Sequence, residues 1–193
     1  MEQQKNETIQ ESAADGSVQQ AIRNRLEEKR SASRSRKKSI LIAAAAVVMA
    51  FLLVYVFFGF AVVSGDSMQP TYEEGDLLIF SRTSGHYEQG DVVLIRTEDG
   101  QEVIKRIVAV PGESLYIDGR TGIVFIDGQE LEENYTQGRT DRENSIDYPV
   151  RLQDDEYFVL GDNRDHSLDS REYGPVTADQ IIGKVLITFR KSN

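Results

Sequence analysis

The dominant feature of the hydropathy pattern is an apolar run from Ile40 to Val63, which spans 24 residues without a charged side chain. As a helix rising ~1.5 Å per residue it would be about 36 Å long, enough to cross the ~30 Å hydrocarbon core of a bilayer. A buried core helix of this length would rarely be apolar on every face. A cleaved signal peptide would have a shorter, earlier apolar region followed by a small-x-small site. We therefore predict a permanent transmembrane helix over residues 39–63.

After Ser64 the pattern changes to short apolar runs separated by turn signals. The Asp-Gly pairs between these runs suit the positive φ angles of hairpin turns. No βαβ alternation appears, so we predict a mainly β, antiparallel domain over residues 64–193. Residues 130–153 are the least regular part and could form a surface loop or the tip of a long hairpin. The predicted strands are residues 76–80, 91–96, 102–110, 114–118, 122–127, 156–160 and 183–189.

Charge on either side of the apolar run predicts the orientation of the chain. Residues 1–38 carry nine Lys/Arg and six Asp/Glu, whereas residues 64–193 carry thirteen and twenty-six. The positive-inside rule then places the N-terminus in the cytoplasm and the β-rich domain outside. Residues 1–38 are polar and poor in large apolar side chains, so we expect a flexible cytoplasmic segment whose basic end can meet anionic lipid heads.

Composition also excludes several classes of function. The chain has no cysteine, which rules out disulfides, cysteine nucleophiles and thiolate metal sites. Its two histidines, His86 and His166, are too few for a His-rich metal centre and leave few candidates for a Ser-His-Asp triad. The formal net charge of −10 argues against a nucleic-acid partner, which normally meets a basic face.

Lys105 stands out in the segment EVIKRIVAV, residues 102–110. In a strand it shares one face with Val103, Ile107 and Ala109, whereas Arg106 points to the other face. Burial on such a face lowers the pKa of a lysine by up to ~3–5 units and lets its amine take a proton from a hydroxyl. Strand alternation alone, however, favours the ordinary interpretation that the ammonium reaches water at a sheet edge.

Two further polar stretches are candidates for chemistry. Ser67 lies in SGDSMQPT, a turn bounded by Gly65 and Pro70 that could expose its hydroxyl and aim backbone N–H groups at an oxyanion. Taken alone, these letters fit an ordinary turn. The stretch GDNRDHSLDSREYGPV, residues 161–176, packs charges of alternating sign, which indicates a fixed network of ion pairs, although a solvated turn has the same composition.

These stretches, taken together, resemble the type I signal peptidase family of membrane-bound serine proteases, particularly its short Gram-positive members. The family's motifs occur in order after the anchor: SGDSMQPT, GDVVLIR, IKRIVAVPGE and GDNRDHSLDSREYG. The resemblance covers nearly everything from the anchor to the C-terminus. It implies a largely antiparallel β catalytic domain with a β-ribbon insertion at about residues 113–153.

The resemblance also implies site roles, without a cofactor or metal. Ser67 would be the nucleophile and Lys105 the general base, and the backbone N–H of Ser67 would belong to the oxyanion hole. Ser167 would hydrogen-bond and orient the lysine, and a structural ion pair would join Asp169 to Arg171. Gram-negative relatives carry an oxyanion-hole serine where this chain has a glycine two residues before the nucleophile, so that side-chain donor is missing here, as is usual in Gram-positive relatives.

The implied substrates are signal peptides of secreted pre-proteins, cut after a small-x-small motif such as Ala-x-Ala. They would bind as an added strand beside the segments that lead into Ser67 and Lys105. The implied location is a bacterial cell membrane, crossed once, with the catalytic domain outside and near the secretion translocase.

Two other interpretations remain. An anchored β-module that binds partners or cell-wall material would leave Ser67 and Lys105 as ordinary surface residues far apart. Self-cleaving repressors use a related Ser/Lys dyad, but they carry a DNA-binding domain where this chain has an anchor. Archaeal and endoplasmic-reticulum signal peptidases replace the lysine with histidine, so Lys105 favours the bacterial type.

Overall fold

The computed structural model describes residues 38–83, 85–142 and 146–191. Its first element is a helix, Lys38–Phe57, with a mean hydropathy of 2.9 and no part of its apolar window buried. At ~1.5 Å per residue its 20 residues span about 30 Å, so it is long and apolar enough to cross a membrane. The predicted flexible segment, residues 1–38, lies outside the described residues except for Lys38.

The prediction that the membrane helix continues to Val63 is wrong at its C-terminal end. Residues Phe58–Val62 form strand β1, which pairs antiparallel with β2 (Leu77–Ser81). Apolar composition does not distinguish helix from strand, and Gly59, a poor helix former, marks the change. A Cβ on Gly59 would lie 2.2 Å from the Phe80 ring, so the strand requires glycine where it packs on β2.

Seven strands form the large sheet, in the order β1-β2-β11-β3-β4-β9-β10, with every neighbouring pair antiparallel. This confirms the mainly β, antiparallel fold class and most of the predicted strands. The remaining members are β3 (Val92–Arg96), β4 (Glu102–Ala109), β9 (Glu156–Leu160), β10 (Val176–Thr177) and β11 (Ile181–Phe189).

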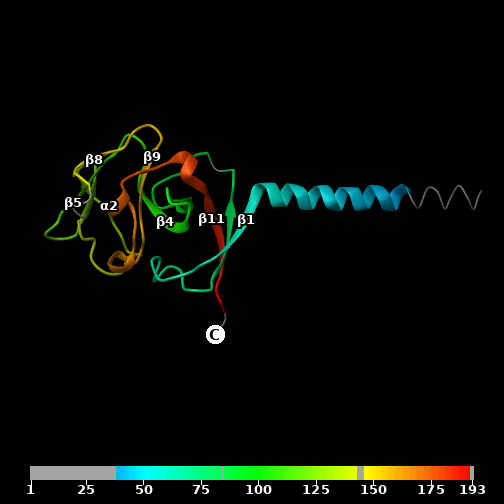
Figure 1. The fold of residues 1–193 in the computed structure, drawn as a ribbon, viewed down its shortest axis with the longest axis horizontal. Helices are drawn as coiled ribbons and strands as arrows, with labels where there is room; N and C mark the ends of the chain where they lie inside the picture. The colour runs from blue at the N-terminus through cyan, green and yellow to red at the C-terminus, as the bar shows by residue number, and fades with distance from the viewer. Residues whose placement is uncertain (1–37, 84, 143–145, 192–193) are drawn as a thin grey trace, which may run out of the picture. The chain divides into compact units, whose positions relative to one another are not determined.

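A second sheet has the order β7-β6-β5-β8. It consists of β5 (Ser114–Ile117), β6 (Val124–Ile126), β7 (Gln129–Glu130) and β8 (Val150–Arg151), so it falls within the expected insertion at residues 113–153. Within the β-rich part of the chain, β5 and β8 lie at the end opposite β1 (Figure 1). The short helical elements are the 3₁₀ turns Arg164–His166 and Ala178–Gln180 and the helix α2 (Ser170–Tyr173).

Two apolar clusters form the core, one on each side of a bulge in β4. Ile107 belongs to the cluster with β3, β9 and β11, whereas Val108 and Ala109 pack with the second sheet. The register of β4 against β9 shifts between Ile107 and Ala109, and this shift breaks the expected alternation. Ala109 therefore does not share the face of Lys105 and Ile107 as predicted, because a bulge inserts a residue into one strand.

One face of β1, β2 and β11 is apolar and exposed. Ile79 of β2 lies between its partners Phe60 of β1 and Ile187 of β11. In the next row, Leu77 of β2 lies between Val62 of β1 and Phe189 of β11. All but the half-buried Ile79 are exposed.

Candidate active site

Ser67 lies in a tight turn that follows β1. The backbone N–H of Gln69 donates to the Asp66 carbonyl at 3.0 Å and closes the turn. Val63 anchors the start of the segment, since its N–H donates to the carbonyl of Asp76 at 2.9 Å. Met68 is 2% exposed and pins the turn to the core, whereas Ser67 itself is only half-buried. The turn thus presents the Ser67 hydroxyl from a fixed backbone.

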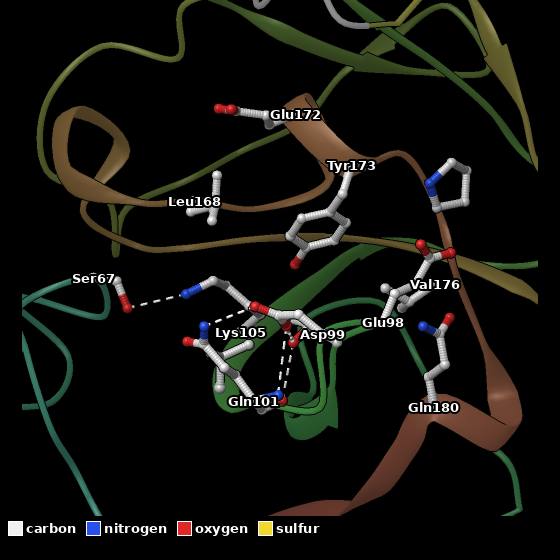
Figure 2. A pocket seen from close by; sticks show the side chains of 13 residues that line it. Ser67, Glu98, Asp99, Gln101, Lys105, Leu168, Glu172, Tyr173, Val176 and Gln180 are labelled. Carbon is white, nitrogen blue, oxygen red and sulfur yellow. Dashed lines mark hydrogen bonds between the residues drawn. The ribbon is translucent and has the colours of Figure 1, made fainter.

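Strand β4 brings the Lys105 amine to this hydroxyl. The Lys105 Nζ lies 3.0 Å from the Ser67 Oγ, and Figure 2 shows the two side chains pointing at one another. Lys105 is 3% exposed, so the ordinary interpretation of a lysine with its head in water is wrong. Burial lowers its pKa from 10.5 to about 8, with a smaller lowering by Arg171, and Asp169 and Asp162 oppose the shift.

The structure forms the expected ion pair between Asp169 and Arg171. The Arg171 Nε and Nη2 donate to the two carboxylate oxygens of Asp169 at 2.8 and 3.0 Å, and both residues are buried. Asp169 also accepts a hydrogen bond from the backbone N–H of Gly161 at 3.0 Å. Arg171 donates in addition to the carbonyls of Arg164 and Ser167. The pair therefore ties together both ends of the loop that follows β9.

Ser167 departs from expectation. Its Oγ is buried and has no hydrogen-bond partner among the described residues, so the expected bond to Lys105 is not formed. The Lys105 amine is instead paired with Ser67. Ser167 packs against Gly161, where an added Cβ would lie 2.1 Å from its Oγ and 2.5 Å from the Ser67 carbonyl oxygen. Ser167 is therefore close to the nucleophile turn without completing a hydrogen bond to the lysine.

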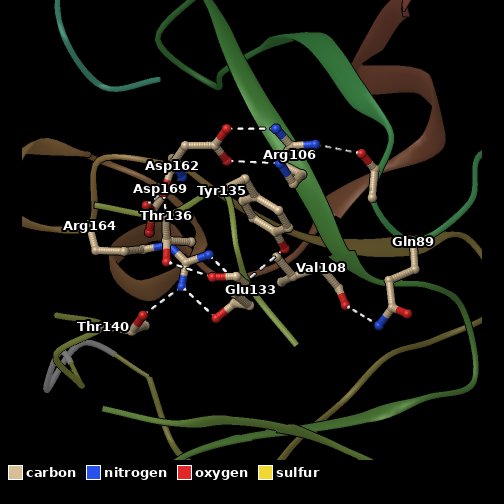
Figure 3. Close-up of polar contacts among 12 residues, drawn as sticks. Gln89, Arg106, Val108, Glu133, Tyr135, Thr136, Thr140, Asp162, Arg164 and Asp169 are labelled. Carbon is tan, nitrogen blue, oxygen red and sulfur yellow. Dashed lines mark hydrogen bonds and ion pairs between the residues drawn. The ribbon is translucent and has the colours of Figure 1, made fainter. Parts of the chain in front are cut away.

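Sequence reasoning missed the partner of Arg106. Its Nε and Nη2 donate to the two oxygens of Asp162 at 2.8 and 2.6 Å, and the Asp162 side chain is completely buried (Figure 3). Thr71, in the segment after the nucleophile, donates to the same carboxylate. The Tyr135 ring stacks on the guanidinium, whose carbon lies 4.1 Å from the ring centroid. The sequence did show a charged Arg106 within a predicted strand and several acidic residues in the stretch 161–176, but nothing that paired them.

The irregular segment before Gln153 also reaches the site, which its composition did not indicate. Arg164, whose side chain is fully buried, donates to both oxygens of Glu133 and to the Thr140 hydroxyl (Figure 3). The backbone of Gln137 forms a parallel bridge with the loop, accepting from the Arg164 N–H and donating to the Asp162 carbonyl. The prediction of a fixed ionic network in residues 161–176 is confirmed, but most of its partners come from distant segments.

Two open spaces adjoin the dyad. A cavity of about 510 Å³ includes Ser67 and Lys105 in its wall, with Val103, Leu168 and Tyr173 among its apolar lining (Figure 2). A groove of about 290 Å³ runs between residues 60–65 and residues 102–104. Within the described residues, no three His, Asp or Glu side chains come together as metal ligands. The arrangement therefore offers serine and amine chemistry next to a groove that could receive an extended peptide.

Comparison with known proteins agrees with this arrangement. The family model of signal peptidases, peptidase S26, matches residues 36–190. A "Probable signal peptidase I-1" from Synechocystis is 34% identical over 155 residues, which cover 74% of this chain and 76% of the relative. The signal peptidase I S of Bacillus subtilis is 33% identical over 158 residues, covering 76% and 84%.

Among solved structures, a signal peptidase I from Enterococcus faecalis aligns with a TM-score of 0.44 and 28% identity, covering 53% of this chain and 97% of that one. The family model spans most of this chain, from residue 36 to residue 190. The chain belongs to the type I signal peptidases of the S26 family.

Proposed function

We propose that this chain is a membrane-anchored serine endopeptidase that removes N-terminal signal peptides from secreted pre-proteins by a Ser67/Lys105 acyl-enzyme mechanism. The observation that carries the proposal is the 3.0 Å separation between the Lys105 Nζ and the Ser67 Oγ. A buried amine with a lowered pKa is the base that a serine hydroxyl needs near neutral pH.

The chemistry follows from this pair. Neutral Lys105 takes the hydroxyl proton as the Ser67 Oγ attacks the scissile carbonyl, and the backbone N–H of Ser67 stabilises the oxyanion. The resulting ammonium gives its proton to the leaving amine, and an acyl-enzyme remains. Lys105 then deprotonates a water that hydrolyses the ester. Gly65 supplies no side-chain donor to the oxyanion, so backbone orientation matters more at this site.

The substrate binds as an extended strand in the groove beside residues 60–65 and 102–104. Both walls of this groove lead directly into a member of the dyad, Ser67 on one side and Lys105 on the other. Main-chain pairing with these walls accepts varied signal sequences, and the confined groove favours small side chains next to the scissile bond. This supports cleavage after a small-x-small motif such as Ala-x-Ala.

The membrane location is supported by the apolar helix and by the charge on either side of it. Basic residues before the helix and acidic residues after the strand β1 favour a cytoplasmic N-terminus and an external catalytic domain near the translocase. The helix ends at Phe57, ten residues before Ser67 rather than four as the sequence suggested. The exposed apolar face of β1, β2 and β11 suits a domain that works at the bilayer surface.

The alternative, an anchored binding module, requires Ser67 and Lys105 to be separate surface residues. Their proximity and the burial of Lys105 count against it. A self-cleaving repressor is disfavoured by the apolar helix at the N-terminal side of the β domain.

The proposal is tested by mixing the detergent-solubilised protein with a pre-protein and mapping the cleavage site by mass. We expect one cut after a small-x-small motif, and we expect Ser67→Ala and Lys105→Ala each to reduce cleavage to background. Lys184→Ala is the matched control and keeps activity, because Lys184 pairs with Asp91 and lines neither the cavity nor the groove. Full activity in either folded dyad variant would refute the mechanism.

A further inference from the structure

Asn163 holds the nucleophile turn at two consecutive carbonyl groups. Its backbone N–H donates to the carbonyl of Ser67 at 3.0 Å. Its side-chain Nδ2 donates to the carbonyl of Asp66 at 3.1 Å. Asn163 is 2% exposed, so water does not compete for these bonds. The side-chain contact joins residues that lie 97 positions apart in the chain.

These bonds connect the nucleophile to the frame that carries the base. Asn163 lies in the loop directly after β9, and β9 pairs with β4, the strand of Lys105. The bond from Gln69 to Asp66 closes the turn internally and cannot fix where the turn points. Asn163 fixes the turn from outside, because it follows β9, and β9 pairs with the strand that carries Lys105.

The side-chain bond also sets the direction of the Ser67 N–H. The Asp66 carbonyl and the Ser67 N–H belong to one planar, trans peptide group, in which they point in opposite directions. By holding the carbonyl, Asn163 aims the N–H away from itself and away from the β9 loop. Resting on the function proposed above, we propose that Asn163 is a positioning residue that orients the Ser67 N–H as the oxyanion-hole donor.

The side-chain oxygen of Asn163, Oδ1, is buried without a hydrogen-bond partner among the described residues, which is an unfavourable arrangement for a residue with only a structural role. Turning the amide over would place this oxygen against the Asp66 carbonyl oxygen, so the observed orientation is the one that donates to the turn. A buried acceptor left unpaired is unfavourable and indicates that the donor is what the site requires.

Asn163→Asp tests this role, because it keeps the shape and the backbone N–H but replaces the side-chain donor with an acceptor. Removing an oxyanion-hole donor outright costs ~10²–10³ in kcat, so misdirecting one should cost about 10- to 100-fold. We expect KM to change by less than about threefold, since a bond to a carbonyl of the turn is not a substrate contact. The lower limb of the pH–rate profile should keep its position in the neutral variant Asn163→Ala, whereas the added carboxylate of Asn163→Asp should move it upward, as the nearby carboxylates do. Asn163→Ala is the second variant and should otherwise behave alike.

A peptide aldehyde supplies a readout that a general loss of structure would not produce. It adds to the serine hydroxyl as a hemiacetal whose oxygen occupies the oxyanion position, whereas the matching peptide amide binds without adding. We expect aldehyde affinity to fall in proportion to kcat/KM and amide affinity to stay the same. Thr140→Val is the control, because it removes a hydrogen bond to Arg164 in the same loop without touching the turn, and it should lower the melting temperature while keeping kcat.

Three outcomes would overturn the role of Asn163: a kcat within twofold of wild type, an equal fall in aldehyde and amide affinity, or an equal kcat loss in Thr140→Val at a matched melting temperature. Failure of the proposed function is distinguishable, because the wild-type protein would then fail to cleave the pre-protein or Ser67→Ala would cleave it.

Discussion

The pKa of Lys105 sets the pH at which this protein should lose activity. With a pKa of about 8, the amine is neutral in about one tenth of molecules at pH 7, whereas an amine at 10.5 would be neutral in about one in 3,000. Burial thus supplies on the order of 100-fold more active base at neutral pH, equivalent to about 3 kcal/mol. Since the neutral amine is the active form, kcat/KM should fall about tenfold for each pH unit below 8 and level off above it.

The assay measures kcat/KM from pH 6 to pH 10 at constant ionic strength, with a quenched fluorogenic peptide that contains a small-x-small site and no titrating side chain. Under these conditions kcat/KM reports the free enzyme, which is the state described by the structure. Activity should return fully when samples held at pH 6 are brought back to pH 8, which excludes irreversible inactivation by acid. A limb centred near 10.5, or a flat profile from pH 6 to 9, would refute the assignment of the buried amine as the base.

Three substitutions, two of them with a matched control variant, extend this reasoning. Lys105→Met should raise the free energy of unfolding by up to about 3 kcal/mol at pH 7 in denaturant titrations, because the folded-state pKa lies below the unfolded value. The wild-type stability should then rise between pH 8 and 10.5 and stay flat below 8, whereas the variant should show no such slope. Arg171→Met should move the lower limb of the pH–rate profile to higher pH, because Asp169 then raises the Lys105 pKa without an opposing positive charge. Arg171→Lys keeps the positive charge and should leave the limb in place. Gly161→Ala should reduce kcat at least tenfold, since its Cβ would lie 2.5 Å from the Ser67 carbonyl oxygen, and Gly85→Ala, which meets no atom within 4 Å, should keep it.

Local pattern was sufficient for most of the fold. Strands β2 to β6, β9 and β11 were predicted correctly, because each is a short apolar run bounded by turn residues. The apolar run after Ile40 was wrongly assigned to a single helix, since hydropathy reports burial or lipid contact and not backbone conformation. The two-residue strands β7, β8 and β10 carry too few side chains to show a period.

The site was less accessible to local reasoning because its parts meet across long sequence separations. Ser67 and Lys105 were identified from motifs, but their separation of 3.0 Å depends on how the turn after β1 meets β4. Asn163 lies within the motif GDNRDHSLDSREYG, but neither the motif nor composition indicates its bonds to the nucleophile turn, and Glu133 lies outside every motif. An asparagine or a glutamate in a polar stretch usually faces water. Asn163 gains its partners where the nucleophile turn meets the loop after β9, and Glu133 gains its partner where the insertion packs onto that loop.

Burial lowers the pKa of the Lys105 amine, and the arrangement of the surrounding charges shows why the nearby carboxylates do not cancel this effect. Asp162 and Asp169 would each favour a protonated lysine, but each carboxylate is held in a two-point contact with an arginine, Arg106 or Arg171. Within the described residues, no carboxylate comes within 4.0 Å of the Lys105 amine. A buried carboxylate is stable only when it is paired, so the arginines both hold the loop together and keep its negative charge from the base. The pairs Arg106–Asp162 and Arg171–Asp169 are therefore part of the catalytic electrostatics, and loosening either pair should affect the pH profile as well as the melting temperature.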